Sequence, residues 1–214
     1  MKKIMFNDRY GLTQAVLERK KTMTRRFIPI DLYNQTDWKA VAEGEFKAVV
    51  DGEGFFHDIR NFGKYRVGEE VAIAQPYKND DVLTYNAYNE DGTAREDGLQ
   101  RHKEMLGSKG YRNKMFVKAE YMPHHIRITD LWFERLQDIS DDDCLKEGIY
   151  VHNPEPGNPN FIGYAYDATP GTNVKRWWFH TPREAFAALI NRVSGPHTWD
   201  GNPWVIAYTF ELVD

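Results

Sequence analysis

The chain has 214 residues and only one cysteine, Cys144. A single cysteine excludes a disulfide within the chain and a cysteine cluster with the spacing of a zinc site. Long apolar runs are also missing. No segment approaches the roughly eighteen residues of a membrane span, and the N-terminus becomes charged before any apolar run of signal-peptide length. We therefore expect a soluble protein of the reducing cytoplasm.

Several catalytic signatures are absent as well. The sequence has no Gly-x-Ser-x-Gly, no phosphate-binding P-loop and no dinucleotide-binding glycine fingerprint. His124 and His125 are adjacent, so on a strand they would point to opposite faces and could not readily share a metal ion. For His180 and His197 a surface or hydrogen-bonded role is favoured over catalysis. The sequence therefore predicts no metal and no cofactor.

Charge is unevenly distributed along the chain. The net charge is −4, yet residues 1–30 carry eight Lys or Arg against Asp8 and Glu18, a local charge of +6 that leaves −10 for the remainder. A basic segment on an acidic body suits the capture of one nucleotide or a short RNA segment better than the tracking of a long duplex.

The composition, with 41% apolar residues, predicts one domain with a real core. We expect a single α+β domain over residues 1–214, with insertions at about 31–65, 78–113 and 150–180. The first insertion mixes glycines and aromatics and predicts short strands or an irregular excursion. The second is polar and predicts a loop, and the third predicts a long loop that covers other parts of the molecule.

Three helices are predicted, at residues 11–20, 140–147 and 182–193. The last has the strongest signals, because Thr181, Pro182 and Glu184 supply an N-cap, a proline at the first helical position and a capping-box glutamate. The alternation of apolar and polar residues predicts a long half-buried strand at 126–136. Further strands are expected at 3–6, 71–74, 115–119 and 202–212.

Residues 20–26 (Lys-Lys-Thr-Met-Thr-Arg-Arg) combine cations and hydroxyls in one short stretch after the first predicted helix. One interpretation is a solvated helix end, favoured by the helix dipole. The other is a site in which a lysine of lowered pKa takes the proton of a threonine while an arginine holds an anion. Glu147, in the last turn of the helix at 140–147, would be unfavourable there unless a cation lay nearby.

Residues 20–26, the segment from Leu136 to Ser140 leading to Glu147-Gly-Ile, and Asn202-Pro-Trp-Val-Ile followed by Phe210 together resemble the ASCH domain, a family of PUA-like β-barrels. The order of the segments matches that family too. The resemblance covers about half of the chain and implies a PUA-like barrel with flanking helices, in a longer bacterial or phage-type subgroup. The family pattern has a glycine two positions before the lysine, where this sequence has Arg19.

Small bacterial ASCH proteins similar to this pattern hydrolyse N4-acetylcytidine. The resemblance implies that Thr24 is the nucleophile, that Lys21 is its activating base, and that Glu147 positions the lysine or shuttles protons. Arg26 would contact an anion or oxyanion. In that arrangement neighbouring cations lower the pKa of Lys21, whereas the Glu147 carboxylate raises it. Either burial must outweigh the carboxylate, or the proton must move between Lys21 and Glu147 during turnover.

The same resemblance leaves a second function open, because many PUA-like barrels bind RNA without catalysis. Lys20, Arg25 and Arg26 would then bind a nucleoside or single-stranded RNA along a basic rim. A base could also stack on aromatic residues, although aromatic side chains that cluster this densely more often pack in the core or anchor a loop. These aromatics are Trp177, Trp178, Phe179 and Trp199.

Overall fold

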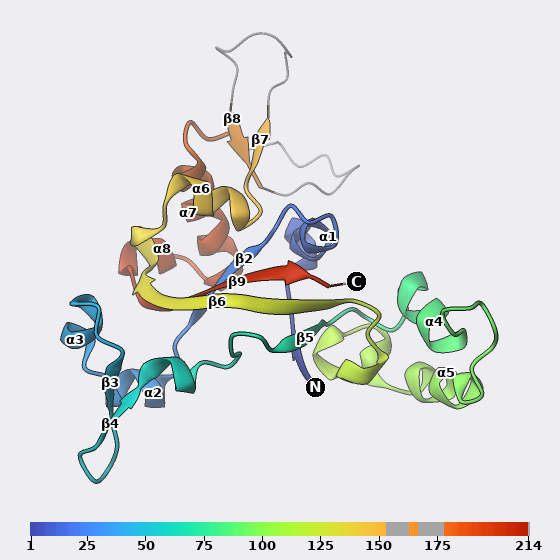
Figure 1. Ribbon diagram of the computed structural model, residues 1–214. Helices are drawn as coiled ribbons and strands as arrows, with labels where there is room; N and C mark the ends of the chain where they lie inside the picture. The colour runs from blue at the N-terminus through green and yellow to red at the C-terminus, as the bar shows by residue number, and fades with distance from the viewer. Residues whose placement is uncertain (153–162, 167–177, 214) are drawn as a thin grey trace.

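The computed structural model describes residues 1–152, 163–166 and 178–213. Its centre is a five-stranded sheet with the spatial order β1-β5-β6-β9-β2 (Figure 1). Only the β1–β5 pair is parallel. The strands are β1 (Lys2–Ile4), β5 (Glu70–Ile73), β6 (His125–Arg135), β9 (Trp204–Leu212) and β2 (Met23–Phe27).

The sheet is open among the described residues, because its edge strands β1 and β2 are not paired with each other. Helices accompany this mainly antiparallel sheet, so the expected α+β class is confirmed. The strands expected at 3–6, 71–74, 126–136 and 202–212 correspond to β1, β5, β6 and β9 with small shifts of their ends.

The longest ladder joins β6 to β9 and forms the middle of the sheet. Its register runs from Ile126 opposite Leu212 to Arg135 opposite Trp204, with a shift between Ile128 and Asp130. The first half of β6 alternates buried and exposed positions, as expected for a strand with one face on the core. On the far side of β9, the short strand β2 pairs antiparallel and places the 20–26 motif at the sheet edge.

Helices α1 (Leu12–Leu17), α6 (Asp141–Lys146) and α7 (Pro182–Ser194) pack on one side of this sheet, with the short α8 (Thr198–Gly201) next to α7 (Figure 1). The capping prediction for α7 is confirmed, since the Glu184 N–H donates to Thr181 Oγ1 at 3.1 Å and the His180 N–H donates to the Glu184 carboxylate at 3.0 Å. Helix α6 begins at Ser140, whose Oγ accepts from the Asp143 N–H.

The main core lies between those helices and the sheet. Four strands of the five-stranded sheet, all except the edge strand β2, contribute apolar residues that meet residues of α1, α6 and α7 there. The most buried members include Ile4, Val16, Ile73, Ile128, Cys144, Phe186 and Tyr208.

The first insertion forms a small unit at one end of the sheet (Figure 1). It consists of α2 (Ile30–Gln35), α3 (Trp38–Ala42) and a two-stranded sheet of β3 (Lys47–Val50) and β4 (Phe56–Asp58). Leu32, Val49 and Ile59 form its own buried cluster. The expected short strands are present, but two helices precede them.

The second insertion lies at the opposite end, and the loop predicted for residues 78–113 is wrong (Figure 1). It contains α4 (Asp80–Ala87) and α5 (Gly98–Leu106). Few apolar residues suffice, because Val82 and Met105 pack into a separate cluster and the buried Asn86 amide donates to two backbone carbonyls at 2.8 Å each. The prediction of a strand at 115–119 is also wrong, since 3₁₀ turns occupy this stretch.

The third insertion is described only in part. A short antiparallel pair joins β7 (Tyr150–His152) to β8 (Gly163–Ala165), and Phe179 bridges to Tyr164. The rest of the predicted covering loop lies outside the described residues. Six 3₁₀ turns complete the described elements: η1 (Asp8–Tyr10), η2 (Ile59–Phe62), η3 (Lys109–Tyr111), η4 (Lys114–Phe116), η5 (Ala119–Tyr121) and η6 (Leu136–Asp138). Within the described ranges, no helix is both long and apolar enough to cross a membrane.

Candidate functional site

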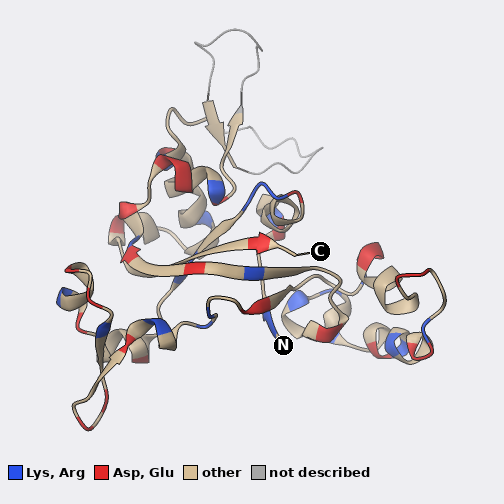
Figure 2. Ribbon diagram, in the orientation of Figure 1, with Lys and Arg blue, Asp and Glu red and all other residues tan. Residues whose placement is uncertain are grey.

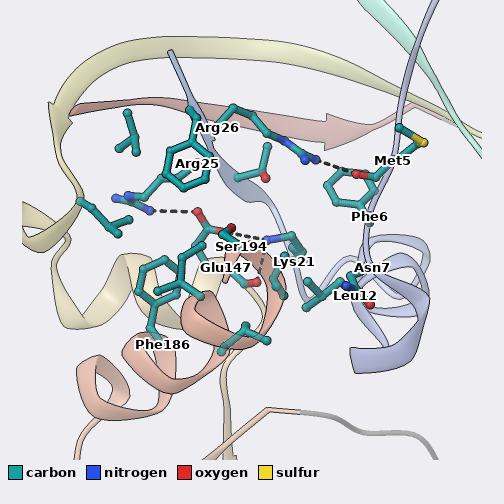
Figure 3. A pocket seen from close by; sticks show the side chains of 17 residues that line it. Met5, Phe6, Asn7, Leu12, Lys21, Arg25, Arg26, Glu147, Phe186 and Ser194 are labelled. Atoms are coloured by element: carbon teal, nitrogen blue, oxygen red, sulfur yellow. Dashed lines mark hydrogen bonds and ion pairs between the residues drawn. The ribbon is translucent and has the colours of Figure 1, made fainter. Parts of the chain in front are cut away.

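A cavity of about 130 Å³ lies where the edge strand β2 meets α7 and the segment after β1. Its walls include Lys21, Thr24, Arg26 and Glu147, so all three predicted catalytic residues and one predicted anion contact face one space. Figure 3 shows Lys21, Arg26 and Glu147 around this cavity. The apolar walls include Phe6 from the segment after β1 and residues of α7 such as Phe186. The cavity thus combines charged groups with an apolar lining, as small-molecule sites commonly do.

Lys21 is brought inward by a tight turn at the end of α1. Arg19 adopts φ +58°, a left-handed conformation that glycine takes readily, at the position where the ASCH pattern has glycine. The backbone N–H groups of Lys20 and Lys21 then both donate to Ala15 O at 2.9 Å, and the Thr22 N–H donates to Lys146 O. This turn connects the end of α1 with the end of α6.

The Lys21 side chain is only 2% exposed. Its Nζ donates to Glu147 Oε2 and to the Glu147 backbone carbonyl, both at 2.6 Å (Figure 3). It also lies 5.9 Å from the centre of the Phe6 ring. Burial with two strong acceptors fixes the ammonium position, and it excludes the solvated helix end as an interpretation of Lys21.

Glu147 caps the C-terminus of α6, directly before Gly148 at φ +104°. A carboxylate there opposes the helix dipole, but two cations compensate for it. Besides Lys21, Arg25 Nη1 donates to Glu147 Oε1 at 3.1 Å. Each carboxylate oxygen is therefore paired with a different cation, and Glu147 is 5% exposed.

Arg25 is held by three carboxylates. Its Nε donates to Glu134 Oε1 at 2.6 Å, and its Nη2 lies 3.6 Å from Asp143 Oδ2, in addition to the contact with Glu147. The side chain is 1% exposed. Because its charge is already met within the protein, Arg25 serves to hold Glu147 in place.

Thr24 and Arg26 form fewer side-chain hydrogen bonds and ion pairs than Arg25 does. Thr24 is 4% exposed and lines the cavity, and none of the hydrogen bonds found in the described part of the chain involves its hydroxyl. Arg26 Nη2 donates to Met5 O at 2.7 Å, and the guanidinium carbon lies 5.7 Å from the centre of the Phe6 ring. Arg26 Nε is buried without a hydrogen-bond partner.

The pKa of Lys21 is lowered from its ordinary value of 10.5. Burial is the largest cause, because a charged ammonium loses hydration inside the protein. The charge and hydrogen bond of Glu147 raise this pKa, while Arg26 and Arg25 lower it further. The balance shifts Lys21 toward its neutral form, the form that can accept a proton.

The remaining predicted residues lie away from the cavity. Lys20 is exposed and pairs with Glu18 at 2.5 Å, so the structure does not bring it to the site. Phe179 and Trp199 pack against the main core, and Trp178 is 42% exposed. Trp177 lies outside the described residues. In the described ranges, no group of three or more His, Cys, Asp or Glu is placed to hold a metal ion.

Two residues of the site were missed by the sequence analysis. Glu134 lies near the end of β6, where Trp132 Nε1 donates to its Oε2 at 2.8 Å. On a strand, a glutamate two residues after a tryptophan lies on the same face, so the sequence could have indicated that Glu134 lies beside Trp132. Asp143 belongs to the acidic first turn of α6, which the helix dipole explains without any partner.

No protein-family model, curated protein or solved structure matches this chain.

Proposed function

We propose that this protein binds a nucleoside and hydrolyses the amide of an N4-acylated, cytidine-type base. One observation carries the proposal: the buried Lys21–Glu147 pair lies in a cavity that Thr24 and Arg26 also line. A lysine and a carboxylate buried together are expensive to maintain, so their placement at a cavity favours a functional role.

The proposed reaction begins when neutral Lys21 accepts the proton of the Thr24 hydroxyl. The oxygen attacks the acyl carbon, and Arg26 stabilises the oxyanion that develops. As the carbon–nitrogen bond breaks, the Lys21 ammonium returns the proton to the leaving amine. Water, again deprotonated by Lys21, then attacks the acyl–threonine ester, and the Lys21 ammonium returns this proton to the leaving Thr24 oxygen. The net reaction consumes one water and releases the amine and the carboxylic acid.

Glu147 has a positioning role in this scheme. Its carboxylate directs Lys21 Nζ, and Arg25 holds that carboxylate from its other oxygen. A carboxylate that stabilises the ammonium also makes the lysine a better proton acceptor at the moment of transfer.

The size of the cavity supports a single-ring base. Its volume of about 130 Å³ is close to the roughly 150 Å³ of an engineered cavity that binds benzene. A pyrimidine ring is of this size, so we expect the base to enter the cavity and the sugar to remain at its mouth.

The ASCH, PUA-like assignment is part of the same proposal. The glycine-like conformation of Arg19 supports it, because the family pattern has glycine at this position. The arrangement of β2 next to β9, with α6 delivering Glu147, also agrees with the order of the three sequence segments. We infer that the open sheet corresponds to the barrel of that family.

The test is incubation of the purified protein with N4-acetylcytidine, with cytidine release followed by chromatography. We expect turnover that is lost in Lys21→Ala, Thr24→Val and Glu147→Ala. Thr22→Val is the matched control, because Thr22 belongs to the same motif but does not line the cavity. Absence of turnover in the unmodified protein across a series of N4-acyl cytidines would refute the hydrolase. Full activity of Thr24→Val would refute Thr24 as its nucleophile.

The second candidate function is a binding module without catalysis. It is favoured by the ion pair itself, since Glu147 stabilises the charged form of Lys21 and the Thr24 hydroxyl is not hydrogen-bonded to Lys21. Such a module would bind cytidine or single-stranded RNA without turnover. Affinity for a short RNA would then fall with salt, and Arg26→Gln would reduce the salt slope.

A further inference from the structure

A second cavity of about 230 Å³ lies on the other side of Arg26. Met5, Arg26 and Phe27 line both cavities, so the two spaces are neighbours. The second cavity is completed by groups that include Lys64, in the segment before β5, and the aromatic side chains of Tyr65 and Tyr208. None of the residues that line it is acidic. Figure 2 shows Lys and Arg in blue along the chain, including the region of β2 and the stretch before β5.

Two cations of this cavity have no carboxylate partner. Within the described residues, neither Arg26 nor Lys64 forms an ion pair; Lys64 Nζ lies 5.4 Å from the centre of the Tyr65 ring. This differs from Lys21 and Arg25, which are both paired with carboxylates. The negative charge of Glu69 helps to raise the pKa of Tyr65 and of Tyr208, but this carboxylate is already paired with Lys2 at 3.0 Å.

Buried hydrogen-bond donors accompany these cations. Arg26 Nε is buried without a hydrogen-bond partner, and the proton of the fully buried Tyr208 hydroxyl has no acceptor among the described residues. Unsatisfied buried polar atoms are rare in folded proteins and call for an explanation, such as a ligand that the site is built to bind. The Tyr65 hydroxyl differs, because it donates to Lys3 O at 3.0 Å.

The protonation states of these groups suit an anion. Burial raises the pKa of Tyr65 to about 12 and also raises the pKa of Tyr208, so both hydroxyls keep their protons at neutral pH. Hydrogen bonding from the backbone N–H groups of Tyr65 and Lys64 to the Tyr208 oxygen favours the phenolate and opposes the rise in the pKa of Tyr208. Burial lowers the pKa of Arg26, and a bound anion would offset this loss of hydration.

We propose that the cavity lined by Arg26, Lys64 and Tyr208 binds the phosphate of a nucleotide whose base occupies the neighbouring cavity. Arginine and lysine with a neutral hydroxyl donor are the groups that recognise phosphate oxygens. The substrate of this protein is therefore a nucleoside monophosphate rather than a free nucleoside. The inference rests on the proposed function only for the identity of the base, since the phosphate site depends on its own residues.

Binding of the expected product, cytidine 5′-monophosphate, tests the inference without any turnover. Calorimetry would compare it with cytidine and with inorganic phosphate at two salt concentrations. We expect the monophosphate to bind at least about tenfold more tightly than cytidine, because it gains charge-assisted hydrogen bonds. Lys64→Gln and Tyr208→Phe should each abolish most of this difference and leave the affinity for cytidine unchanged.

The controls separate a ligand site from a structural role. Lys103→Gln, which removes an exposed lysine on the distant helix α5, should keep the full preference for the phosphate. Tyr208→Phe removes a buried hydroxyl whose proton has no acceptor among the described residues, so the melting temperature should change little while the phosphate preference is lost. Equal affinities for cytidine and its monophosphate, or a preference that persists in both variants, would overturn the inference.

A cytidine dinucleotide, whose phosphate is a diester, distinguishes the source of the phosphate. Tighter binding of the dinucleotide, lost in Lys64→Gln, would support the phosphate site and overturn the monophosphate as its ligand. Hydrolysis results separate this inference from the proposed function. Binding that depends on Lys64 without hydrolysis of the N4-acetylated monophosphate would refute the hydrolase alone. Equal hydrolysis of the nucleoside and its monophosphate, unaffected by Lys64→Gln, would refute the phosphate site alone.

Discussion

Replacing Glu147 by glutamine removes one charge from the centre of the site and leaves the shape of the side chain almost unchanged. At an effective dielectric constant of about 20, the attraction over 2.6 Å to Lys21 Nζ is about 6 kcal/mol, and over 3.1 Å to Arg25 Nη1 about 5 kcal/mol. Desolvation of the ions offsets several kcal/mol of this attraction. Arg25 keeps Glu134, so most of the loss falls on Lys21. We expect Glu147→Gln to reduce the free energy of unfolding by about 3–5 kcal/mol at pH 7.

The loss should depend on pH in a defined direction. In Glu147→Gln the buried Lys21 escapes an unpaired charge by releasing its proton, so its pKa falls further below 10.5 than in the unmodified protein. The unfolded chain then binds more protons than the folded one at any pH between that lowered pKa and 10.5. Stability of the variant therefore rises with pH in this window, by up to about 1.4 kcal/mol per pH unit, and the loss relative to the unmodified protein shrinks between the lowered pKa values of Lys21 in the two proteins.

Urea unfolding at pH 7, 8 and 9 would measure both effects. Glu18→Gln is the control, because it removes a carboxylate from the exposed pair with Lys20 and should cause no measurable change. The double variant Lys21→Met/Glu147→Gln should be more stable than Glu147→Gln alone, since it removes the stranded cation. A Glu147→Gln variant as stable as Glu18→Gln, or a loss that does not shrink with rising pH, would contradict the reasoning.

Three further predictions concern the site and its supports. In the proposed reaction the base is neutral Lys21, so kcat/KM should rise with pH until the lowered pKa of Lys21 is passed; a profile that falls with rising pH over this range would contradict its role as base. Gly148→Ala should destabilise the protein by about 1–3 kcal/mol in thermal unfolding, because φ is +104° and the new Cβ would lie 3.2 Å from Leu12 Cδ2; an unchanged melting temperature would refute this. Burial raises the pKa of Cys144 to about 12, so a thiol reagent should modify it only on unfolding, and rapid labelling of the native protein would be inconsistent with the fold.

Local sequence signals were sufficient to predict the helix with a capping motif and the strand with alternating side chains. The capped helix at Thr181 and the alternating strand at 126–136 are both present, because caps and side-chain periodicity act over a few residues. The helices of residues 78–113 were missed because polar surface residues dominate their composition. Only Val82 and Met105 supply large buried apolar side chains there, and a buried asparagine contributes hydrogen bonds instead.

The site was predicted in part, and the limits have physical causes. The structure places Lys21, Thr24 and Glu147, which the resemblance to a known pattern singles out, around one space. Lys20, which was expected to bind the ligand, is exposed instead, because the left-handed turn at Arg19 directs only Lys21 inward. The pairing of Arg25 with carboxylates from β6 and α6 could not be predicted, because it depends on long-range packing.

The pairing of β2 with β9 has a consequence for how the protein is made. Met23 lies opposite Thr209, so the strand that carries Thr24 finds its partner almost a whole chain length later. Emerging from the ribosome, residues 20–26 must wait without a partner strand until residues 204–212 have been synthesised. Contacts of such large sequence separation also form slowly. The nascent protein is therefore expected to acquire its buried lysine among its last folding events, and a ribosome stalled before β9 would hold an inactive chain.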